Sequence, residues 1–145
     1  TSARHLACNQ HGDLVVGLQN YGPRSNVVPV IGAVTRQGIT PLNLPQALGA
    51  RLRNYCGSIR FDSTGEFFAA TCPKGGAAII GRMSADRVHF HSHFEMDDVC
   101  GVQAGGGRGE FYLTGGAGHI AVFSAIKGRA GWLAHHPMQF DNHTS

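Results

Sequence analysis

The chain contains an internal repeat. Residues 56–68 align without a gap against residues 100–112, so that Gly65-Glu66-Phe67 falls 44 residues before Gly109-Glu110-Phe111. A fainter copy near the start of the chain has Gly12-Asp13 at the equivalent position. A period in the low forties, made of short strands and glycine turns, is typical of β-propellers, in which each repeat forms one four-stranded blade.

Composition agrees with a globular all-β domain. The 145 residues are 42% hydrophobic and 14% charged, which favours a chain with an apolar core over a disordered one. Glycine, at 21 residues, has about twice its usual share of roughly 7%, as many tight turns require. The net charge of +3 comes from scattered lysines and arginines without a basic run, which argues against nucleic-acid binding. No apolar run approaches the ~18 residues of a transmembrane helix.

The middle repeat predicts four strands. Ile59 and Phe61 alternate with polar residues, and the glycine turn that follows indicates a hairpin. The sequence therefore predicts an all-β chain of about three four-stranded antiparallel blades, which form a single propeller segment. The expected strands of the middle repeat are residues 57–61, 66–71, 77–82 and 87–94, those of the last repeat are 101–104, 110–114, 119–125 and about 132–135, and the blades cover about 1–54, 55–98 and 99–145.

The first repeat is longer than the others, because 53 residues separate Gly12 from Gly65. The additional residues are expected in loops around 19–26 and 40–50. Prolines in the second of these loops argue against a central strand, and residues 46–52 have the composition of a short helical turn.

Three blades do not close a propeller, which needs about four to eight. Two sheet faces would be left uncovered. We therefore expect the chain to be part of a larger propeller, with its missing blades supplied by the same protein, by another copy or by another chain.

The repeat resembles a known family. Residues 58–76 resemble the blade motif of a bacterial exported propeller family, domain of unknown function fifteen-thirteen (DUF1513), and Phe140-Asp141-Asn142-His143 resembles its C-terminal aromatic-Asp-Asn-His signature, with Phe in place of Trp. The resemblance covers nearly the whole chain and corresponds to the C-terminal part of a propeller of about seven blades. It implies a periplasmic protein exported by the twin-arginine route, with a link to iron uptake and a periplasmic partner protein, but no established activity.

Four cysteines leave the disulfide pairing open. If Phe61 lies opposite Glu66 across the hairpin turn, Cys56 lies opposite Thr71. A disulfide between Cys56 and Cys72 would then require a bulge or a different turn length. The alternative is that the cysteines are small buried residues.

One expected strand carries a histidine ladder. His89, His91 and His93 have a spacing of two residues, which places them on one face of a strand, with Phe90 and Phe94 on the other. Imidazoles bind transition metals such as Fe, Cu or Zn, so the ladder is a candidate metal site. The simpler interpretation is a polar outer strand, which we favour because side chains two apart lie about 6.5–7 Å apart along a strand.

A second candidate site follows from the propeller fold. Loops between second and third strands, and loops from an outer strand to the next inner strand, emerge on one face, where ligands often bind. We call this the loop face. The alternative is that its polar residues are ordinary solvated loop ends. The expected ligand-binding residues are Tyr21, Arg24, Lys74, Asp97, Asp98, His119, Asp141, Asn142 and His143, with Arg53 and Tyr55 close by.

Catalytic motifs are scarce. The sequence contains no Gly-x-Ser-x-Gly, Walker, His-Glu-x-x-His or Cys-x-x-Cys motif, and the glycine-rich residues 105–109 align with a hairpin turn. We therefore favour a non-enzymatic module that binds a ligand or partner, with or without a transition metal. The alternative is an enzyme that performs metal-assisted or acid-base chemistry through His119, Asp141 and His143.

Overall fold

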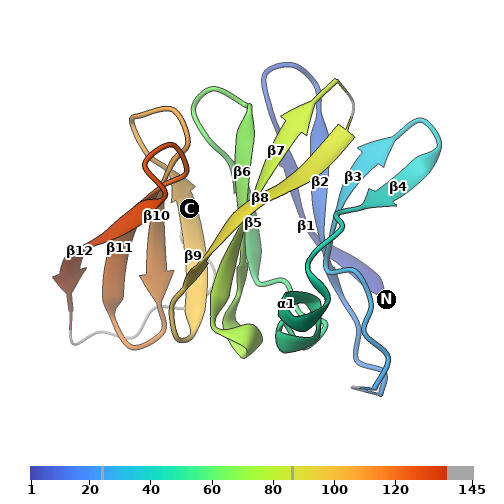
Figure 1. The fold of residues 1–145 in the computed structure, drawn as a ribbon, viewed down its shortest axis with the longest axis horizontal. Helices are drawn as coiled ribbons and strands as arrows, with labels where there is room; N and C mark the ends of the chain where they lie inside the picture. Colours follow the sequence, from blue (N-terminus) through green and yellow to red (C-terminus); the bar gives the residue numbers. More distant parts are fainter. Residues whose placement is uncertain (24, 86, 137–145) are drawn as a thin grey trace.

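The computed structural model describes residues 1–23, 25–85 and 87–136. They form three four-stranded antiparallel sheets, side by side, in which each strand pairs with the next along the chain (Figure 1). We number these sheets as blades 1 to 3, and they confirm the predicted all-β architecture.

Blade 1 contains β1 (Ser2–Cys8), β2 (Leu14–Gln19), β3 (Ile31–Thr35) and β4 (Gly38–Pro41). Blade 2 contains β5 (Ser58–Phe61), β6 (Phe67–Cys72), β7 (Ala77–Ser84) and β8 (Arg87–Glu95). Blade 3 contains β9 (Val99–Ala104), β10 (Glu110–Gly115), β11 (His119–Ser124) and β12 (Arg129–His135).

Two apolar cores hold the blades together. Phe68 and Ile79 of blade 2 pack with Val15 of blade 1, whereas Phe67 and Ile80 pack with blade 3. Neighbouring residues of a strand point to opposite sides of the sheet. Strand β6 is buried at every position because both faces of blade 2 are covered. The first strands of the blades also adjoin, β1 contacting β5 and β5 contacting β9.

Short helical segments connect the strands at the loop face. Helix α1 (Gln46–Arg51) lies between β4 and β5, where a helical turn is expected, and the 3-10 helix η1 (Pro73–Gly75) follows β6. Arg51 ties the two together, because its Nε donates a hydrogen bond of 2.8 Å to the Gly75 carbonyl and its guanidinium pairs with Glu95. Among the residues that the structure describes, no helix is long and apolar enough to cross a membrane.

Polar side chains connect the β1–β2 and β5–β6 turns to the next blade. Asn9 Nδ2 donates a hydrogen bond of 2.8 Å to the Gly65 carbonyl in blade 2. Asp62, which is 4% exposed, accepts one of 2.8 Å from the Gly109 amide in blade 3. Asp62 therefore occupies in blade 2 the place that Asn9 has in blade 1. The alignment puts Gly106, which has no side chain, at this position in blade 3.

The first hairpin of blade 2 has a longer turn than the sequence predicts. Phe61 pairs with Phe68, not with Glu66, so the register differs by two residues. The Asp62 carboxylate accounts for the difference, because its Oδ1 accepts hydrogen bonds of 3.1 Å from the amides of Glu66 and Phe67 and holds the wider turn in place. Ser58 consequently pairs with Thr71.

Two buried cysteines lie close together, Cys56 just before β5 and Cys72 at the end of β6. Cys56 and Cys72 are both fully buried in the core between blades 1 and 2. A hydrogen bond with the Cys56 thiol, together with burial, raises the pKa of the Cys72 thiol well above its ordinary value. All four cysteines are free thiols in the structure.

Strand β8 does not present its three histidines on one face. Its register on β7 shifts at His91, where one residue is inserted, and such a bulge exchanges the two faces of the strand beyond it. His93 pairs with Ile79 on the side of blade 1. The ring of His91 lies 5.2 Å from that of Phe67 on the side of blade 3, and His89 lies on that side too. The shared face predicted for the ladder is therefore wrong.

The phenylalanines of β8 show the same exchange of faces. Phe90 packs against the core between blades 1 and 2, and Phe94 packs against the core between blades 2 and 3. The sequence predicts both on one face. The bulge lets one outer strand contribute an aromatic ring to each core.

Candidate functional site

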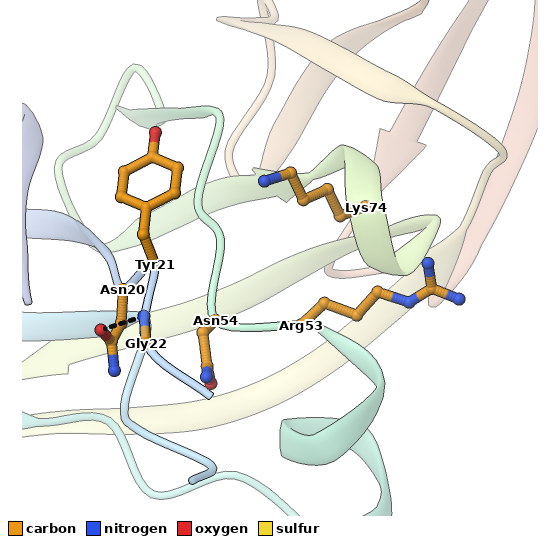
Figure 2. Close-up of a pocket in the computed structure, with 6 residues that line it drawn as sticks. All are labelled: Asn20, Tyr21, Gly22, Arg53, Asn54 and Lys74. Carbon is orange, nitrogen blue, oxygen red and sulfur yellow. Dashed lines mark hydrogen bonds between the residues drawn. The ribbon is translucent and has the colours of Figure 1, made fainter. Parts of the chain in front are cut away.

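A pocket of about 370 Å³ opens at the loop face where blades 1 and 2 meet. It is lined by three connections: the loop after β2, the segment between α1 and β5, and η1 (Figure 2). In Figure 1 these connections lie at the lower end of the blades, beside α1. The lining residues are Asn20, Tyr21, Gly22, Arg53, Asn54 and Lys74.

The segment before β5 builds one wall by pairing with the end of β2. The Asn20 amide donates a hydrogen bond of 2.9 Å to the Asn54 carbonyl, and Gln19 and Tyr55 form an isolated antiparallel bridge. Arg53 and Asn54 have φ angles of 55° and 56°, in the left-handed region that residues other than glycine rarely adopt. Two consecutive residues of this kind are typical of a functional or tightly constrained segment.

The side chain of Asn54 stabilises this backbone from below the pocket. It is 5% exposed. Its Nδ2 donates a hydrogen bond of 2.8 Å to the Asn26 carbonyl, and its Oδ1 accepts one of 3.1 Å from the Val28 amide. The loop after β2 is therefore held against the segment before β5, and the pocket is formed before any ligand binds.

Two tyrosine rings position the amino group of Lys74. Lys74 Nζ lies 4.1 Å from the centroid of the Tyr55 ring and 5.4 Å from that of Tyr21, and Figure 2 shows the amino group directed towards Tyr21. The Tyr21 hydroxyl donates a hydrogen bond of 2.9 Å to Gln19 Oε1. Cations over aromatic faces are favourable, so the two rings hold the lysine at the pocket.

The electrostatics of the pocket are positive. Among the residues that the structure describes, its lining includes Lys74 and Arg53 and no acidic side chain. Figure 2 shows that the Arg53 guanidinium points away from Tyr21. The two cations therefore reach different parts of the pocket region. Such a lining attracts anions and offers the Asn20 side-chain amide as a neutral donor.

The structure brings together only some of the predicted loop-face residues. Tyr21 and Lys74 line the pocket, whereas Arg24, Asp141, Asn142 and His143 lie outside the described residues. The remaining three, Asp97, Asp98 and His119, do not line it.

Those three residues lie in blades 2 and 3. Asp97 Oδ1 is 3.5 Å from where a Cβ at Gly76 would lie. The carbonyl of Asp98 accepts a hydrogen bond of 2.9 Å from the Gly116 amide, which joins the β8–β9 connection to the β10–β11 connection. The ring of His119 packs beside that of His135. The pocket therefore gathers only Tyr21 and Lys74 of the predicted residues that the structure describes.

Sequence reasoning missed part of the lining. Asn20, Gly22 and Asn54 carry no motif, and only the tolerance of asparagine for left-handed backbone was a usable signal at Asn54. Within residues 1–23, 25–85 and 87–136, no group of three or more His, Cys, Asp or Glu side chains could hold a metal ion.

Comparisons with solved structures agree with the fold. The structure of streptogramin B lyase, a β-propeller, matches 97% of this chain and 42% of its own length, at 16% sequence identity and a TM-score of 0.60. The complex of KlAtg21 with the coiled-coil of AgAtg16 matches 83% of this chain and 38% of its own, at 12% identity and a TM-score of 0.53. The chain thus spans less than half the length of either match.

Sequence comparison identifies the family. No curated protein matches the chain. The model of the family described as "Protein of unknown function (DUF1513)" matches residues 1–145, the whole chain, in agreement with the blade motif and the three blades. The chain therefore belongs to the DUF1513 family.

Proposed function

We propose that this chain is part of a non-enzymatic propeller that binds a small anionic molecule in the loop-face pocket between blades 1 and 2. The observation that carries the proposal is a pocket of about 370 Å³ whose described lining residues include two cations and an exposed tyrosine but no acidic side chain. Its volume lies within the range of about 300–1,000 Å³ that is usual for small-molecule sites.

The ligand expected from this lining carries a carboxylate or phosphate. Lys74 supplies a point charge with three donors, and the Asn20 side-chain amide supplies a neutral donor. The ring of Tyr21, whose residue is 69% exposed, offers a flat apolar surface beside the cation. An anion attached to a ring or a short carbon chain would contact the Lys74 amino group with its charge and the Tyr21 ring with its apolar part.

The test measures binding of two probe anions, citrate and inorganic phosphate, by isothermal titration calorimetry at low salt. Lys74→Gln is expected to weaken binding of the better probe about tenfold or more, since hydrogen bonds to charged groups contribute about 1.5–3 kcal/mol. Lys127→Gln is the matched control, because Lys127 is the other lysine of the chain and does not line this pocket. Equal affinity of Lys74→Gln and the unmodified protein, or no saturable binding of either probe, would contradict the proposal.

We propose that further blades cover the open faces of blades 1 and 3. Leu6, Val34 and Ile39 lie on the side of blade 1 opposite Val15 of the core, and Tyr112 lies on the outward side of blade 3. All four are exposed, by 38% to 63%. Apolar patches of this kind are normally covered.

Native mass spectrometry of the protein isolated from its own host tests this partner. We expect a longer chain that contains additional blades. A complex of several copies, or a complex with another chain, would show that the additional blades come from that second source. A stable monomer of 15.4 kDa would contradict it.

Location in the periplasm and a link to iron or other metal uptake are supported by the family resemblance described above. Cell fractionation of the host tests the first, and expression under iron limitation tests the second. Protein confined to the cytoplasm, or a level independent of iron supply, would contradict these two proposals respectively.

A further inference from the structure

Two histidines face each other across the outer hairpin of blade 3. His119 begins β11, His135 ends β12, and the two are directly paired in the antiparallel register. Side chains of such a pair project from the same face, with Cβ atoms about 4.5–5.5 Å apart. Their ring centroids lie 4.6 Å apart, with planes inclined by 45°.

The pair lies on the side of blade 3 that faces blade 2. Trp132 pairs with Ala121, a fully buried residue of the core between these blades, and its ring lies 6.3 Å from that of Phe94 in β8. The ring of His119 is 5.6 Å from that of Trp132. A further blade beside blade 3 would pack on its opposite side, so it would not cover the histidines.

A backbone contact determines the tautomer of one ring. His135 Nε2 lies 3.1 Å from the Ala117 carbonyl oxygen. A carbonyl oxygen only accepts hydrogen bonds, so Nε2 carries the proton and Nδ1 carries the lone pair. Histidines that bind metals are oriented in this way, with the second ring nitrogen donating to a backbone carbonyl or carboxylate.

The distance between the rings matches two imidazoles on one ion. A metal bound at about 2.0–2.1 Å from an imidazole nitrogen lies roughly 3.2 Å from the ring centroid, so two adjacent imidazole ligands have centroids about 4.5–5 Å apart. The observed 4.6 Å falls within this range. We infer that His119 and His135 bind a divalent transition metal, Cu²⁺ most tightly, with water at the remaining positions.

The choice of ion follows from the ligands. Imidazole suits Cu, Ni and Zn, and Cu²⁺ binds most tightly among the divalent ions of this series. No third His, Cys, Asp or Glu completes the pair within residues 1–23, 25–85 and 87–136. The site is therefore open and exchangeable, and it is independent of the anion pocket between blades 1 and 2.

Tryptophan fluorescence tests the inference directly, because Trp132 is the single tryptophan of the chain and its ring adjoins His119. Untagged protein is titrated with CuCl₂, and the midpoint of quenching is measured. We expect saturable quenching by one ion per chain, which excess Zn²⁺ reverses. His119→Ala and His135→Ala should each raise the midpoint at least tenfold, whereas His89→Ala, the same change on β8, should leave it unchanged.

Electron paramagnetic resonance of the Cu²⁺ complex provides a readout that does not depend on the tryptophan. The spectrum should show coupling to two imidazole nitrogens, reduced to one in either blade 3 variant. Circular dichroism of each variant establishes that it is folded. Unsaturable quenching, an unchanged midpoint in both folded blade 3 variants, or a complex without imidazole nitrogens would overturn the inference.

Discussion

Replacing Asp62 by alanine should destabilise the protein strongly, because one buried carboxylate serves both a turn and the contact between two blades. Its Oδ2 accepts hydrogen bonds from Thr64 Oγ1 at 2.7 Å and from the Gly109 amide at 2.8 Å. Its Oδ1 accepts hydrogen bonds from the amides of Glu66 and Phe67 at 3.1 Å. In Asp62→Ala the buried amides of Phe67 and Gly109 lose this partner.

The magnitude follows from those two amides. Leaving a buried donor without a partner costs about 1–3 kcal/mol, and removing the carboxylate relieves part of the cost of burying a charge. The expected loss in free energy of unfolding is therefore about 2–4 kcal/mol. Asp62→Asn should lower the free energy of unfolding by less, about 1–2 kcal/mol. The Oδ1 atom of asparagine can still accept hydrogen bonds from the turn, whereas its NH₂ group cannot accept one from the Gly109 amide.

Urea unfolding monitored by circular dichroism measures both changes. Asp97→Ala is the matched control, since Asp97 is an exposed aspartate at the opposite end of blade 2. The reasoning is refuted if Asp62→Ala costs less than about 1 kcal/mol, a value below that of a single buried unpaired donor. It is also refuted if Asp62→Asn is as stable as the unmodified protein, because the bond to Gly109 would then contribute nothing.

Two further predictions concern the contacts within and between blades. The side-chain hydrogen bond from Arg108, reinforced by Arg82, holds the pKa of Glu66 below its ordinary value. The ionised carboxylate therefore stabilises the fold fully above about pH 4.3, the ordinary pKa of glutamate. This contribution to the free energy of unfolding is lost as pH falls through the lowered pKa. Urea unfolding of Glu66→Gln should therefore show a stability deficit at pH 7 that shrinks at pH 3.5, and a deficit that is the same at both would contradict this. In β7, a Cβ on Gly81 would lie 2.1 Å from Cζ of the buried Phe68, so Gly81→Ala should lower the free energy of unfolding by about 1–3 kcal/mol. The control is Gly131→Ala, which should cost much less because the atom nearest to its new Cβ is 3.7 Å away. Equal losses in the two variants would contradict the prediction, because the core around Phe68 would then accommodate the extra methyl group.

Architecture was the part of this protein that could be predicted from sequence. The repeat at Gly65 and Gly109 and the alternation of Ile59 and Phe61 are local signals, and they identified antiparallel blades before any contact was known. The glycine-rich residues 105–109 are likewise a hairpin turn, in which the Gly105 amide donates to the Glu110 carbonyl. Strand type and turn position depend mainly on neighbours in the chain, which explains why these predictions are confirmed.

The candidate sites depended on tertiary structure. Strict alternation predicts His89, His91 and His93 on one face. The bulge at His91 places His93 on the other face and lets Phe94 pack into the core between blades 2 and 3. The pairing of His119 with His135 depends on strand register, which the spacing of the histidines along the chain does not reveal.

Sequence by itself determined that the chain folds into blades of four short strands, because the period of apolar residues and the glycine turns are properties of each repeat. Only the tertiary structure decided which polar residues meet. The loop-face pocket joins Tyr21, Arg53 and Lys74 from three connections, and Asp62 reaches Gly109 in the next blade. These contacts arise where blades pack together, and packing selects the bulge in β8 that local periodicity leaves open.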